Sequence, residues 1–208
     1  MSPHHIDLDE PKCSEYDYGR RFGTNSKIWD VYDTRASNSG PTGPTSQKDS
    51  LFWLRRSRAV KGAYKMYSSQ IRGTGSKGEN EPVAACRAWL RGNVLLTRAP
   101  QVTVAELEWH TLIHKVEALD SYRLFTLADG NTYQWTNQGK FLEKVKNLGE
   151  KESEVRERIA KVVIAGNSGI NLIVDESKIP REIALCTALC FWVDQWNTNL
   201  ALRGIYWG

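Results

Sequence analysis

The chain has 208 residues, of which 40% are hydrophobic and 25% charged, an ordinary composition for a globular protein. That length supports one well-buried domain and excludes two large ones. The formal net charge of +4 is unevenly distributed, because residues 51–100 hold ten Lys or Arg against two Glu, a net of +8. Such a cluster attracts phosphate-bearing partners, either nucleic acid or an anionic membrane surface, and it equally suits the solvated outer face of two or three strands.

The four cysteines, Cys13, Cys86, Cys186 and Cys190, lack the paired spacing of a zinc site. The N-terminus lacks the basic and then apolar order of a secretion signal. We therefore expect an intracellular protein with free thiols, in the cytoplasm or peripheral to a membrane, with no metal and no cofactor. Cys186 and Cys190 are four residues apart in an apolar segment, so they are expected to pack as small apolar groups.

The first part of the chain combines an irregular start with short β-favouring runs. Residues 1–19 are acidic and polar without periodicity, which predicts a mobile lead-in before a single domain over residues 20–208. Residues 27–34 alternate as a strand does, and the Gly, Pro and Ser of residues 37–46 predict a loop.

Two aromatic runs follow, at residues 51–58 and 62–68, and each has the length of a strand. Arg56 and Arg58 are expected to project from one face of the first run, with Lys65 as a neighbour on the second. The next segment, residues 72–78, is rich in glycine, but it lacks the Gly-Lys-Ser/Thr of a phosphate-binding loop and predicts a turn.

The middle of the chain continues with strands at residues 83–90, 94–97 and 101–110, the last of which alternates apolar and polar residues over most of its length. His110 and His114 are four residues apart, as metal ligands on a helix would be. In an extended segment they lie over about 12 Å apart, so no metal site is expected.

A hairpin is the clearest local prediction. Two β-rich runs within residues 122–135 flank Asp129-Gly130, which suits a two-residue turn with positive φ at both positions. Residues 141–146 predict a further strand. Residues 152–163 fit a helix or a strand, and a strand from about Arg158 is favoured because it makes a hairpin with residues 170–174.

Near the end, the run Ile183 to Val193 carries no charge, so a helix through it has no solvent face. Eleven residues span about 16 Å, whereas a membrane-spanning helix needs about 20 residues, so no transmembrane segment is expected. Some ten strands without helical crossovers, followed by one apolar helix, predict a mainly β protein: a closed antiparallel β-barrel that encloses a hydrophobic C-terminal helix at about residues 180–197.

Four segments together resemble fungal tubby-like domains of unknown function: residues 104–110, residues 125–135, residues 172–176 and the apolar helix. These domains belong to the tubby C-terminal-like group, with plant LURP-one-related proteins and phospholipid scramblases. The resemblance covers roughly residues 20–200, and it implies a β-barrel around a hydrophobic C-terminal helix. Tubby proteins bind phosphoinositide headgroups through basic side chains, but their binding residues have no individual matches in this chain.

No nucleophile, base and orienting group form a recognisable motif, so we expect a non-enzymatic binding module. Its expected ligand is an anionic lipid headgroup or another phosphorylated group. The alternative is a structural or protein-interaction barrel, and single-stranded nucleic acid ranks lower because alternation turns many nearby aromatic side chains inward. The candidate ligand-binding residues are Arg55, Arg56, Arg58, Lys61 and Lys65.

Overall fold

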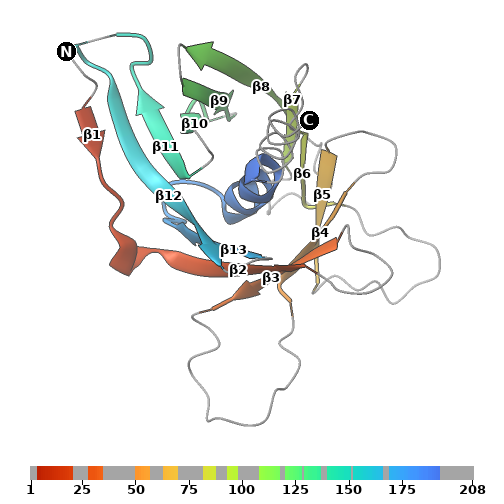
Figure 1. Ribbon diagram of the computed structural model, residues 1–208. Helices are drawn as coiled ribbons and strands as arrows, with labels where there is room; N and C mark the ends of the chain where they lie inside the picture. Colours follow the sequence, from red (N-terminus) through yellow and green to blue (C-terminus); the bar gives the residue numbers. More distant parts are fainter. Residues whose placement is uncertain are drawn as a thin grey trace, which may run out of the picture.

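The computed structural model describes residues 4–20, 28–34, 50–56, 63–69, 82–87, 93–97, 108–117, 120–127, 129–136, 140–150, 152–165 and 169–192. These residues form a mainly β protein with one α-helix, at residues 181–192 (Figure 1). In chain order the other elements are β1 (His4–Ile6), the 3-10 helix η1 (Glu10–Lys12), β2 (Ser14–Arg20), β3 (Ile28–Asp33), β4 (Phe52–Arg56), β5 (Ala63–Ser68), β6 (Ala84–Arg87), β7 (Asn93–Thr97), β8 (Glu108–Glu117), β9 (Asp120–Thr126), β10 (Thr132–Trp135), β11 (Phe141–Lys146), β12 (Val155–Ala165) and β13 (Gly169–Val174).

The strands form one large sheet in which neighbours along the chain pair antiparallel from β2 through to β13. The long strand β12 pairs antiparallel with two strands along its length: β11 over residues 155–161 and β13 over residues 160–165. β13 also pairs with β2, while β1 pairs with β12 in the parallel direction. The sheet therefore brings the first two strands, β1 and β2, beside the last two, β12 and β13.

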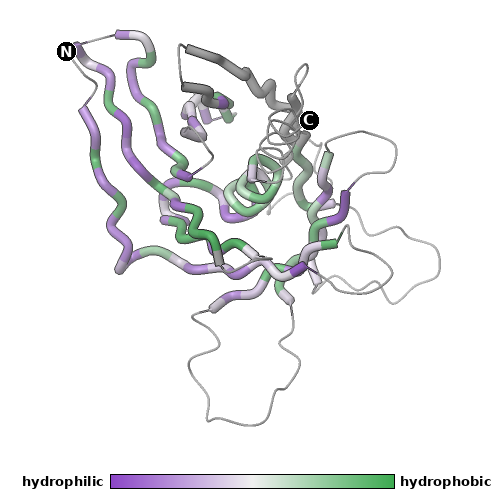
Figure 2. The backbone as a smooth tube through the Cα atoms, in the orientation of Figure 1, coloured by the Kyte–Doolittle hydropathy of each residue, from purple (hydrophilic) through white to green (hydrophobic). Residues whose placement is uncertain are grey.

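The helix lies on the concave side of this curved sheet (Figure 1). Every side chain from residue 183 to residue 191 is buried, and the helix shows the green of hydrophobic residues in Figure 2. The carbonyl of Pro180 accepts from the N–H of Ala184 at 3.2 Å, so the helix begins directly after this proline. Within the described ranges, no helix is both long and apolar enough to cross a bilayer.

Side chains of the sheet tie the helix in place through polar contacts as well as burial. The Tyr18 hydroxyl donates to the carbonyl of Leu185 at 2.8 Å, and Trp135 Nε1 donates to Thr187 Oγ1 at 3.0 Å. The Trp135 ring also packs edge-on against Phe191, with ring centroids 5.9 Å apart. These contacts give buried polar groups partners, without which each would destabilise the fold.

The N-terminal residues differ from the mobile lead-in expected for residues 1–19. Residues 4–6 and 14–20 form β1 and β2, and Tyr16 and Tyr18 are in the hydrophobic core. The side chains of β2 alternate between the core and the outside, but only two inward positions are strongly apolar. Because its own sequence predicts a strand only weakly, β2 is stabilised mainly by pairing with β3 and β13.

The hairpin between β9 and β10 is confirmed, but its predicted two-residue turn is wrong. Gly130 N donates to the carbonyl of Leu127, and Leu127 N donates to that of Asn131, so three residues form the loop. Of the two described loop residues, Asp129 and Gly130, only Gly130 takes positive φ, at 79°, which is the left-handed position of a three-residue hairpin loop. Asp129 does not adopt positive φ. Its carboxylate accepts a hydrogen bond from the N–H of Asn131.

Other expected boundaries also changed. β12 begins at Val155, which resolves the ambiguous segment as strand, and β8 runs on to Glu117 beyond the predicted end at His110. The expected loop at residues 37–46, the glycine-rich turn at residues 72–78 and the helix beyond residue 192 lie outside the described residues.

Candidate functional site

The outer face of β4 and β5 carries two of the charged side chains that the sequence singled out, Arg55 and Lys65. Phe52 and Leu54 of β4 are buried, so period-two alternation turns Trp53 and Arg55 to the opposite face. In β5, Tyr64 and Met66 are buried and Lys65 is exposed. Both strands form because aromatic and other large apolar side chains on one face are buried in the hydrophobic core.

Across these two strands the register creates two side-chain pairs on the outer face. Arg55 lies directly opposite Lys65, and Trp53 lies directly opposite Tyr67. The two aromatic rings are stacked, with centroids 4.2 Å apart and an angle of 15° between their planes. We call these four residues the β4–β5 outer patch. It places two cations beside a flat aromatic surface.

Arg56 does not belong to this patch, and here the predicted arrangement is wrong. Arg56 pairs with Tyr64, on the face that Phe52 and Leu54 share, whereas Lys65 opposes Arg55. Burial raises the pKa of Tyr64 to about 12, and the Arg56 charge acts in the opposite direction. The two remaining candidates, Arg58 and Lys61, lie outside the described residues.

A second polar group occupies the outer face of β10, β11 and β12. Gln134, Glu143 and Arg158 are directly opposed in register, and both Gln134 and Glu143 are 2% exposed. Gln134 Oε1 and Glu143 Oε2 are buried without a hydrogen-bond partner. Glu143 Oε1 lies 3.7 Å from Arg158 Nε and 3.8 Å from Nδ1 of His5 in β1.

Burial raises the pKa of the Glu143 carboxyl, although the positive charges of His5, Arg156 and Arg158 lower it in part. The folded protein therefore favours the protonated form more than the unfolded chain does. In the register of the sheet, the carboxyl lies between Arg158 of β12 and the amide of Gln134 of β10, and His5 of β1 is 3.8 Å from it.

The cysteines pack as apolar groups, as expected for Cys186 and Cys190. All four are free and buried, and the Cys190 thiol donates weakly to the carbonyl of Cys86 at 3.5 Å. Burial raises the pKa of the Cys86 and Cys186 thiols well above the ordinary value, which makes them poor nucleophiles. Among the residues that the structure describes, no three His, Cys, Asp or Glu side chains gather as metal ligands would.

The sequence missed two features of these sites. The outward direction of Trp53 and Tyr67 was readable from the alternation of Phe52 and Leu54, but their stacking depends on the β4–β5 register. The contact of His5 with Glu143 joins residues far apart in the chain, and only strand pairing brings them together.

Comparison with known proteins adds no relative: no family model, curated protein or solved structure matches this chain. The sites described above therefore rest on their own geometry.

Proposed function

We propose that this protein is a non-enzymatic binding module that holds an anionic, phosphate-bearing ligand, foremost a membrane lipid headgroup, on the β4–β5 outer patch. The observation that carries this proposal is the direct opposition of Arg55 and Lys65 beside the stacked rings of Trp53 and Tyr67. Cationic side chains attract phosphate, and Trp and Tyr favour the interface between headgroups and hydrocarbon. Together they suit contact with an anionic bilayer from outside.

We also propose that the sheet closes into a barrel around the helix, as in the tubby-like domains that the sequence resembles. Support comes from β12, which bonds to β11 and to β13, while β13 bonds to β2. Burial of every side chain from residue 183 to residue 191 supports the enclosure of the helix. In such a barrel the interior is filled, so a ligand binds the outer surface.

Liposome flotation tests the ligand. The assay compares three kinds of vesicle: phosphatidylcholine alone, phosphatidylcholine with a phosphoinositide, and phosphatidylcholine with phosphatidylserine at equal charge. This comparison separates recognition of the phosphoinositide headgroup from non-specific attraction to negative charge. Each basic residue near an anionic leaflet contributes about 1 kcal/mol, so the double variant Arg55→Gln, Lys65→Gln is expected to lower partitioning roughly 30-fold.

The matched control is Lys140→Gln, Lys146→Gln, which removes two exposed cations from the region of β11, across the helix from the patch (Figure 1). This control is expected to partition like the wild type. Equal partitioning of the wild type and the patch variant would overturn the proposal. So would tight binding of a single-stranded oligonucleotide with no vesicle binding, because the stacked aromatic pair would then serve bases.

A further inference from the structure

A different surface is formed by the N-terminal segment, residues 4–12, which contains β1 and η1. Its side chains are exposed, except for the half-buried Leu8. The first core residue is Cys13, directly after the segment. Because buried apolar side chains hold most elements in place, this segment lacks the principal source of attachment.

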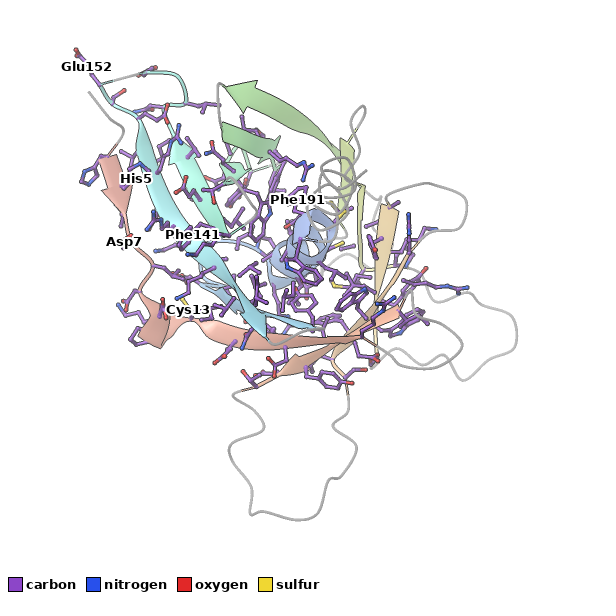
Figure 3. All side chains as sticks on the ribbon, viewed as in Figure 1. His5, Asp7, Cys13, Phe141, Glu152 and Phe191 are labelled. Atoms are coloured by element: carbon purple, nitrogen blue, oxygen red, sulfur yellow. The ribbon has the colours of Figure 1, made fainter. Side chains whose placement is uncertain are left out.

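Polar contacts with β12 and the residue before it hold the segment instead. β1 pairs with residues 155–157 in the parallel direction, and His4 N donates to the carbonyl of Glu154 at 3.0 Å. Two carboxylates then meet cations of β12: Asp7 Oδ1 lies 2.7 Å from Arg158 Nη1, and Glu10 Oε1 lies 2.6 Å from Lys161 Nζ. Figure 3 labels His5 on β1 and Asp7 directly after this strand, beside β12.

These ion pairs are exposed at the carboxylate end, with Asp7 at 83% and Glu10 at 47%. Exposed ion pairs stabilise weakly, and salt screens them. The ladder between β1 and β12 is only three residues long and is supported by these weak ion pairs. Separating the segment from β12 therefore costs a small fraction of the free energy needed to unfold the whole domain.

Opening would leave β12 in place, because its other edge bonds to β11 over residues 155–161 and its second half bonds to β13. Residues 155–157 would then present unpaired backbone groups at an exposed edge. Such an edge accepts an extended peptide as an added strand.

We propose that this edge of β12 is a docking site for an acidic peptide of a partner protein that pairs as a strand over its first residues, and that the N-terminal segment is its intramolecular occupant. The segment itself shows which chemistry fits. It runs parallel to β12 and places carboxylates three residues apart, against Arg158 and Lys161. Two residues before the first carboxylate, His5 faces the buried Glu143.

The fitting peptide therefore has the pattern His-x-Asp-x-x-Glu. Backbone pairing supplies the affinity, while Arg158, Lys161 and Glu143 supply the selectivity for this side-chain pattern. Because the segment competes for the same edge, the partner binds with an apparent affinity reduced by the open fraction. This proposal concerns β12 and is independent of ligand binding at the β4–β5 outer patch.

The test uses a fluorescein-labelled peptide with the sequence of residues 4–12, measured by anisotropy against the full-length chain. The double variant Asp7→Asn, Glu10→Gln loosens the segment without altering β12. Each lost pair is expected to raise peptide affinity about two- to fivefold. Adding Lys161→Gln removes the cation that faces Glu10 and is expected to lower the affinity again.

A control peptide carries Asp7→Asn and Glu10→Gln and is expected to bind more weakly than the unchanged peptide. Equal binding of the two peptides, or no gain in the double variant, would overturn the proposal.

Hydrogen exchange on the unaltered chain gives a second measurement that no folding defect can obscure. Amides of residues 4–6 are expected to exchange faster as salt rises, while those of residues 170–174 keep their rate. Exchange of residues 4–6 only with global unfolding would show that the segment does not open.

Discussion

The helix buries every side chain from residue 183 to residue 191, and Leu189 tests how much stability this burial supplies. Leu189 is 0% exposed within the core cluster. Burying a leucine side chain is worth about 1.5–3 kcal/mol, and an unfilled cavity raises the cost of Leu→Ala to about 2.7–5 kcal/mol. We expect Leu189→Ala to lower the free energy of unfolding by about 3 kcal/mol, a large share of the roughly 5–15 kcal/mol of a typical domain.

Urea denaturation followed by tryptophan fluorescence measures this loss. The matched control is Leu148→Ala, in the turn after β11, where the side chain is 45% exposed and the expected change is below about 0.5 kcal/mol. Leu189→Asp adds an unpaired buried charge and is expected to yield insoluble or unfolded protein. A soluble, folded Leu189→Asp protein, or a Leu189→Ala loss no larger than that of the control, would refute burial of the helix.

Two further predictions concern buried polar groups. Thr187→Val removes the acceptor of Trp135 Nε1, so it is expected to cost about 1–3 kcal/mol in urea denaturation, whereas Thr187→Ser keeps the hydroxyl and stays near the wild type; equal losses in both would contradict this role. Glu143→Gln supplies an amide donor beside Gln134 Oε1 and removes a buried charge, so it is expected to stabilise the protein by about 1 kcal/mol at pH 7. Because the folded state raises the pKa of Glu143, its contribution to stability is complete below pH 4.5 and is lost as the pH rises through the raised pKa. The advantage of Glu143→Gln is therefore expected to grow with pH in denaturation series, and a constant or inverse difference would show that the carboxyl ionises at no cost.

Local patterns predicted much of the sheet because each strand satisfies its own alternation or composition. β3, β4, β5, β11 and β13 lie within or close to the expected ranges. The prediction failed where pairing with another strand outweighs the local preference of the sequence. β1 has three exposed side chains and exists through its pairing with β12, which no nearby residue indicates.

The candidate basic site was only partly predictable. Alternation places Arg55 and Arg56 on opposite faces, which is a local property of any strand. Whether Lys65 meets Arg55 or Arg56 depends on register, and a shift of one residue exchanges the faces. The structure places Lys65 opposite Arg55, so the two strands were predicted correctly and the neighbour of Lys65 was not.

The sequence by itself determined the mainly β composition of the fold, the β9–β10 hairpin and the helix through the uncharged run after Glu182, because these depend on periodicity and turn chemistry within a few residues. Only the tertiary structure decided which strands are neighbours, and therefore that Trp53 stacks on Tyr67 and that His5 reaches Glu143. Those contacts join separate strands, and their register is selected by burial of the whole core against the helix.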